Sequence, residues 1–124
     1  MMKHVFFAVC LTFGFVSFSK AQGDTNVAKA QTKTELVRAK ETGVFVFEIP
    51  GRTDADIQKS SKYYTHYFTV DFDEGTHTAT VTMVENNKEN RVVIARFLIS
   101  SGMRQVMVDT EKFTINQFKD TYLL

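Results

Sequence analysis

The stretch FEIPGRTDADIQKS, residues 47–60, contains a change from strand to helix that decides the fold. Its first residues complete the run VFVFEI at 44–49, which is β-branched and aromatic and is typical of a central strand covered at least partly on both faces. Pro50 and Gly51 end this strand, because proline cannot donate a ladder hydrogen bond and glycine tolerates a sharp turn. We therefore expect a strand in the middle of a sheet, followed by a helix.

The helix that follows begins at Thr53 or Asp54, either of which can serve as its N-cap. Acidic residues occupy the first turn, where the positive end of the helix dipole stabilises them. The helical period predicts one buried face. That face carries Ile57, Ser61, Tyr64 and Phe68.

Two alternating runs, YFTVDF at 67–72 and THTATVTMV at 76–84, predict a β-hairpin. The residues DEG at 73–75 join them and supply a glycine where the turn needs a positive φ. Threonine alternates with alanine, valine and methionine in the second run, so one face of the predicted sheet is apolar and the other is polar.

A second helix is predicted over NNKENRVVIARFLISSG, residues 86–102. Asn86 and Glu89 have capping-box spacing, and Gly102 is a left-handed stop. The predicted buried stripe comprises Val93, Ile94, Phe97, Leu98 and Ser101. The segment MRQVMVDT at 103–110 then alternates as a strand. Its faces are Val106 and Val108 on one side, and Met103, Gln105 and Met107 on the other.

A terminal helix is predicted to begin after Thr114. Phe113 and Phe118 have the spacing of a hydrophobic staple, and Gln117 has that of a capping-box partner. The buried face of this helix would carry Ile115, Phe118 and Tyr122.

The elements follow the order strand, helix, two hairpin strands, helix, strand. With right-handed crossovers this order predicts an α+β ferredoxin-like βαββαβ two-layer sandwich, extended by the C-terminal helix. Helices would cover one face of an antiparallel sheet and leave the other face free. The alternative is another two-layer α+β design, in which the segment before residue 43 forms a first helix against a curved sheet.

The N-terminal sequence MMKHVFFAVCLTFGFVSFSKAQG, residues 1–23, has the parts of a secretory signal. Lys3 precedes an apolar run, and Ser19 and Ala21 form a small-residue cleavage site. The run has about 14 residues, fewer than the roughly 20 that span a bilayer, so a cleaved signal is favoured over a retained membrane anchor.

Three segments follow from this interpretation: a signal peptide at 1–21, a linker at 22–42 that becomes helical or pairs late around 35–40, and a folded α+β domain at 43–124. We expect a protein of the bacterial periplasm or cell exterior, without a stable membrane span once the signal is cleaved.

Signal cleavage changes the chemistry of the mature chain. It removes Cys10, which is the only cysteine, so thiolate catalysis, disulfides and thiolate metal sites are excluded. It also removes Lys3 and Lys20, two of the 15 basic residues, while all 14 acidic residues remain, so the formal charge becomes about −1. Without a basic excess, nonspecific nucleic-acid binding has no electrostatic basis.

Residues 44–110 resemble the heavy-metal-associated domain of copper chaperones and mercury-binding proteins, in the order and length of the elements and in the strand-loop-helix transition. In that family a glycine precedes two cysteines, each after two intervening residues, and the thiolates bind soft ions such as Cu(I). In register, Gly51 matches the glycine, Asp54 falls on the first cysteine and Ile57 on the second. A carboxylate is a hard ligand and isoleucine is none, so the resemblance implies the fold and not metal transfer at these positions.

Methionine and histidine offer a second type of metal site. Met103, Met107 and Met83, with His66 and His77, are soft or intermediate ligands suited to copper in an exported protein without cysteine. Methionines on strands more often fill gaps in a core, and no Met-rich or His-x-His repeat concentrates these residues. We therefore predict no metal or other cofactor, and keep these positions as weak candidates.

Tyr63, Tyr64 and Tyr67 cluster at the end of the first helix and are the candidate binding residues. Tyrosine is enriched at protein interfaces, where its ring supplies contact area. We expect part of the cluster to pack against the sheet, because a tyrosine ring is often buried while its hydroxyl reaches water.

Catalysis has little support in the sequence. The acidic segment DFDEG at 71–75 is better explained as a hairpin turn than as a calcium loop, and no serine lies in a nucleophile elbow.

The first hypothesis for the function is a non-catalytic binding or interaction module with an unknown protein partner, acting through the open sheet face or the aromatic end of the first helix. The second is a periplasmic metal-binding protein with Met and His ligands. The third is a small enzyme with a pocket that joins His66 or His77 to an acid.

Overall fold

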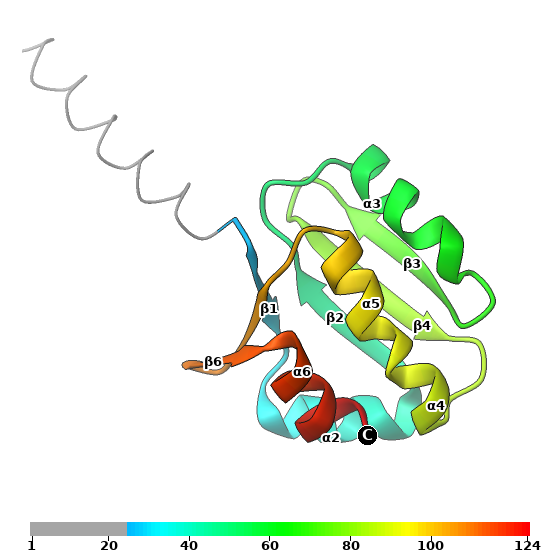
Figure 1. Cartoon of the computed structure of the whole chain (residues 1–124), viewed down its shortest axis with the longest axis vertical. Coiled ribbons are helices and arrows are strands. Elements are labelled where there is room, and N and C mark those ends of the chain that lie inside the picture. The colour runs from blue at the N-terminus through cyan, green and yellow to red at the C-terminus, as the bar shows by residue number, and fades with distance from the viewer. Residues whose placement is uncertain (1–24) are drawn as a thin grey trace, which may run out of the picture.

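The computed structural model describes residues 25–124, which form a two-layer α+β fold around a six-stranded mixed sheet (Figure 1). The predicted signal at 1–21, including Cys10, lies outside the described residues. The strands are β1 (Val27–Ala30), β2 (Val44–Glu48), β3 (Phe68–Asp73), β4 (Thr78–Met83), β5 (Gln105–Val108) and β6 (Glu111–Thr114). The helices are α2 (Lys33–Thr42), α3 (Asp54–Ser61), α4 (Lys88–Arg91), α5 (Val93–Ser100) and α6 (Ile115–Phe118), with a 3-10 turn η1 (Lys62–Tyr64) and a terminal π-helical turn η2 (Lys119–Leu123).

The strand order is β3-β4-β2-β1-β5-β6. The four predicted strands keep the relative order of a ferredoxin-like sheet, and β1 is inserted between β2 and β5. β1 pairs antiparallel with β2 and parallel with β5, while β6 extends the edge beyond β5. The prediction of a plain four-strand βαββαβ topology is therefore wrong, although the α+β two-layer class is confirmed.

The segment predicted as a linker, 22–42, contains both β1 and α2 in its described part. Thr32 caps α2 through a capping box, accepting from the Glu35 backbone N–H at 3.2 Å while Glu35 accepts from the Thr32 N–H at 3.1 Å. Gly43 ends the helix in a left-handed conformation, with φ of 79°. The folded unit thus begins before residue 43, and a first helix forms as in the alternative considered from the sequence.

The core lies between the helices and one face of the sheet. In Figure 1, α5 crosses in front of β2 and β4, and α3 lies beside it. Phe68 of β3 contacts Phe97 of α5 edge to face, with ring centroids 5.9 Å apart, and Phe47 of β2 contacts Phe118 of α6 in the same way at 5.8 Å. The inner strand residues and the apolar helix stripes therefore form one continuous core.

The predicted second helix is divided into α4 and α5. Asn87 caps α4 by accepting from the Asn90 backbone N–H at 2.8 Å, so the predicted capping box of Asn86 and Glu89 is wrong. Asn86 instead donates to the carbonyl of Lys40 at 2.8 Å. This bond ties the end of α2 to the loop before α4.

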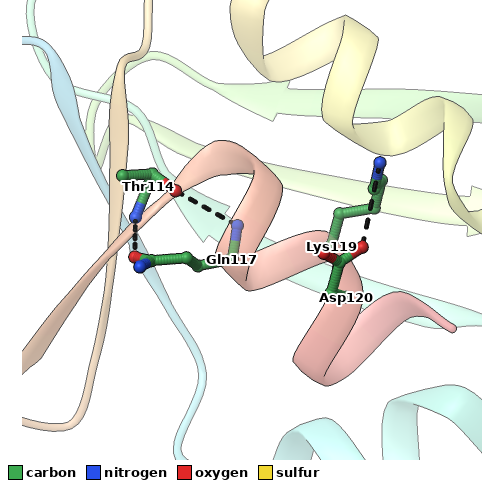
Figure 2. A network of polar contacts seen from close by, with 4 residues as sticks. All are labelled: Thr114, Gln117, Lys119 and Asp120. Atoms are coloured by element: carbon green, nitrogen blue, oxygen red, sulfur yellow. Dashed lines mark hydrogen bonds and ion pairs between the residues drawn. The ribbon is translucent and has the colours of Figure 1, made fainter.

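The predicted terminal helix is present as α6. Figure 2 shows its capping box: the Gln117 backbone N–H donates to Thr114 Oγ1 at 3.1 Å, and the Thr114 N–H donates to Gln117 Oε1 at 2.9 Å. The predicted face, Ile115, Phe118 and Tyr122, is buried. The chain end thereby packs against α2 and α5.

Candidate functional site

A surface cleft lies between α3 and the end of α5, with a volume of about 580 Å³. We call it the α3–α5 cleft. It is lined by Gly51, Arg52, Asp56, Lys59, Ser60, Tyr63, Ser100, Ser101 and Gly102. These residues come from two parts of the chain that are far apart in sequence and are joined by the packing of α3 on α5.

The strand-to-helix loop forms one wall of the cleft. Thr53 caps α3 in a capping box with Asp56: the Asp56 backbone N–H donates to Thr53 Oγ1 at 3.2 Å, and the Thr53 N–H donates to an Asp56 carboxylate oxygen at 3.0 Å. The backbone hydrogen bond from Thr53 is the main reason why the pKa of Asp56 lies below its ordinary value. Asp56 is therefore ionised at neutral pH and engaged in starting the helix.

Arg52 joins this loop to the end of α5. Its Nε donates to the carbonyl of Ser101 at 2.7 Å, and its Nη1 donates to the carbonyl of Gly51 at 3.2 Å. The guanidinium lies directly over Gly102, where a Cβ would overlap Nη2. A cation at the negative end of the α5 dipole is favourable, so Arg52 acts as a side-chain cap for that helix.

Hydroxyl groups connect the two helices in the floor of the cleft. Ser60 Oγ lies 3.1 Å from the carbonyls of both Asp56 and Ser100 and can donate to either. Tyr64 shares a hydrogen bond of 3.0 Å with Ser100 Oγ. Ser101 Oγ is buried and has no hydrogen-bond partner among the described residues.

The three candidate binding tyrosines have different environments. Tyr63 is 72% exposed, lies at the rim of the cleft and carries the Lys62 ammonium 5.2 Å from its ring centroid. Tyr64 is half-buried and stacks on Phe68, with centroids 6.0 Å apart. Tyr67 does not line the cleft and contacts His66 edge to face. Of the three, only Tyr63 lines the cleft, and its ring is exposed apart from the contact with Lys62.

The candidate metal ligands are not brought together. Met103 is fully buried in the core, although the alternation of 103–110 predicted that it shares a face with Met107. Met107 is half-buried on β5. His66 precedes β3 and His77 lies in the turn after it, so the six-residue strand, about 20 Å long, separates them. Within 25–124, no group of three or more His, Cys, Asp or Glu side chains is arranged to hold a metal ion.

The positions aligned with the family cysteines also diverge. Asp54 is exposed at the first position of α3, where its backbone N–H donates to Glu74 at 2.6 Å. Ile57 is fully buried in the core. The two side chains therefore do not face a common site.

The open face of the sheet is a second candidate surface. Strand pairing places Asp73, Thr78, Glu48, Lys29, Met107 and Lys112 in one row across it. These side chains are exposed or half-buried, and a shallow cavity of about 340 Å³ lies around Lys29 and Glu48. The row is acidic toward β3 and basic toward β6, with the half-buried Met107 as its apolar member.

In the part of the chain that the structure describes, no helix has both the length and the apolar character needed to cross a membrane.

The sequence pattern predicted Tyr63 as a binding residue but did not predict the rest of the cleft. The spacing of Thr53 and Asp56 was the local signal for its first wall, whereas the contribution of residues 100–102 had no local signal.

No family model matches the chain, and comparisons with curated proteins and with solved structures gave no significant match.

Proposed function

We propose that this chain is a small exported binding module without catalytic function, and that the α3–α5 cleft is its binding site. The observation that carries the proposal is the cleft, whose volume of about 580 Å³ lies within the roughly 300–1,000 Å³ typical of ligand sites. Tyr63 offers an exposed ring at its rim, and Arg52 and Lys59 offer charge inside it. A ligand could thus be held by both ring contact and polar groups.

The hydrogen bonds of the cleft serines support binding over catalysis. A nucleophilic serine needs an adjacent base that accepts its proton. Ser60 instead donates to a backbone carbonyl, that of Asp56 or of Ser100, and neither His66 nor His77 lines the cleft. Export is supported by the basic start, apolar run and small-residue cleavage site in residues 1–21.

We also infer a distant relationship in fold to heavy-metal-associated domains. The inference rests on the sequence of elements β2, α3, β3, β4, α5 and β5, and on their relative order in the sheet. Insertion of β1 between β2 and β5 is a departure from that fold. The relationship concerns the architecture and brings no metal site with it.

Native mass spectrometry of the protein purified from its own cells or growth medium tests the proposed function. We expect a chain that begins at Gln22 and carries a bound ligand or partner. The bound mass should be lost in Tyr63→Ala and retained in Tyr67→Ala, because Tyr67 does not line the cleft. A bare chain, or equal loss in both variants, would contradict binding in the cleft, and a mass that retains Met1 would contradict export.

A further inference from the structure

The guanidinium of Arg52 is fixed in place and still has donors to offer. Of its five N–H groups, the one on Nε and one on Nη1 donate to backbone carbonyls. Three remain without an acceptor among the described residues. Its position over Gly102 and its two backbone bonds hold the side chain in one orientation. A preorganised guanidinium loses little freedom when it binds a second acceptor.

Lys59 adds a second uncommitted cation to the same cleft. Neither Arg52 nor Lys59 forms an ion pair among residues 25–124, where the ion pair present joins Lys119 and Asp120. After the Thr53 hydrogen bonds, which are the main cause, both cations also help to lower the pKa of the Asp56 carboxylate, so the three groups lie close to one another. Asp56 neutralises only one of the two positive charges, and its carboxylate already accepts the N–H of Thr53.

Hydroxyl groups complete the polar lining. The Tyr63 hydroxyl has no protein partner among the described residues, and Ser101 Oγ is buried without one. A buried polar atom without a partner is rare and often marks the position of a water or a ligand group. Both hydroxyls lie in residues that line the cleft beside the two cations.

We propose that the α3–α5 cleft binds an oxyanion, namely a carboxylate or phosphate group of its ligand, between Arg52 and Lys59. This inference rests on the proposed function and specifies the chemistry of its ligand. Arg52 donates its free N–H groups to the anion, Lys59 supplies charge, and the ring of Tyr63 contacts the rest of the ligand. Carboxylates and phosphates are the acceptors that a planar guanidinium binds in a bidentate manner.

The site is separate from the start of α3. That helix N-terminus already has an anion, because the Glu74 carboxylate accepts the Asp54 backbone N–H at 2.6 Å. The proposed oxyanion therefore depends on the side chains of Arg52 and Lys59 and not on the helix dipole.

The test is a titration of the purified protein with anions. NMR chemical shifts of the backbone amides and of the Arg52 Nε–H monitor the binding. Inorganic phosphate and acetate are the probes, and sodium chloride keeps the ionic strength constant. We expect saturable shifts at Gly51, Arg52 and Gly102. A stronger response to phosphate indicates a phosphate-bearing ligand, and a stronger response to acetate indicates a carboxylate.

Matched variants separate a site from general attraction of anions. Lys59→Gln should weaken binding about fivefold, as expected for an exposed charge contact. Lys88→Gln removes the same charge from an exposed lysine at the start of α4 and should leave binding unchanged. Arg52→Gln should weaken it about tenfold, because a hydrogen bond to a charged group is lost. If Arg52→Gln fails to fold, the pair of lysine variants decides the question.

The absence of saturable shifts with both probes would overturn the proposal, as would equal weakening by Lys59→Gln and Lys88→Gln. If neither anion binds but a native ligand is still lost in Tyr63→Ala, the oxyanion inference fails and the binding module stands. If saturable anion binding occurs while the native protein carries no ligand or partner, the oxyanion site stands and the proposed function fails.

Discussion

The contact between Gly102 and Arg52 allows a quantitative test of how the cleft is built. Gly102 has a φ of 89°, a conformation that costs an L-residue about 1–2 kcal/mol. A Cβ at this position would also overlap Arg52 Nη2 and displace the guanidinium. The displaced side chain would lose its bond to the Ser101 carbonyl, worth about 1.5–3 kcal/mol for a charged donor. Because Arg52 is only half-buried, we expect Gly102→Ala to lower the free energy of unfolding by about 2–4 kcal/mol.

A double-mutant cycle separates backbone strain from the clash. In an Arg52→Ala background the side chain that would be displaced is absent, so Gly102→Ala should cost only the strain, about 1–2 kcal/mol. The coupling between the two substitutions should therefore be about 1–2 kcal/mol. The free energy of unfolding of all four variants is measured by urea titration. Far-UV circular dichroism monitors the unfolding, because the chain has no tryptophan for fluorescence.

Gly51 is the matched control, since its φ is 71° and a Cβ there would meet only Thr25 side-chain atoms, no closer than 3.4 Å. Gly51→Ala should thus show the strain without the clash, about 1–2 kcal/mol. A cost for Gly102→Ala that is the same with and without Arg52 would refute the reasoning, because the overlap with the guanidinium would then contribute nothing.

Three further predictions concern the cap, the pH dependence and the core. Thr32→Ala removes the α2 capping box and should lower the free energy of unfolding by about 1 kcal/mol in urea titrations; an unchanged midpoint would contradict the cap. Asp56 has a folded-state pKa below the unfolded value of 3.8, so it contributes stability above about pH 4 that is lost as pH falls through the folded value. Unfolding at neutral and acidic pH should show a smaller loss in Asp56→Asn than in the unmodified protein, and equal losses would show that the cap is not the cause. Met103→Ala should cost about 2–5 kcal/mol because the side chain is fully buried, whereas Met107→Ala on the open face should cost much less; similar costs would contradict their different burial.

Patterns among residues close in sequence correctly predicted several helices and strands. A continuous β-branched and aromatic run gave β2, alternating residues gave β3 and β4, and cap residues gave α3 and α6, because strand composition, strand period and helix capping depend on neighbours a few residues apart. The same signal was present at Thr32 and Glu35, with Gly43 as the stop, and would have located α2 fully. These elements need no long-range information to be recognised.

β1 shows where local information fails. Its sequence VAKA is short and half alanine, so neither β propensity nor alternation identifies it. It becomes a strand because it pairs on both sides, with Lys29 opposite Glu48 on β2 and Val27 opposite Gln105 on β5. Met103 similarly departs from strand alternation, since its burial depends on how the chain leaves α5.

By itself, the sequence determined the two-layer class, the main hairpin, the starts of α3 and α6 and one residue of the cleft, Tyr63. Each of these depends on side-chain period or on contacts between near neighbours. Only the tertiary structure decided that β1 enters the sheet between β2 and β5 and that Arg52 meets residues 100–102. Those contacts join segments far apart in the chain, and their free energy comes from packing and pairing that exist only once the core has formed.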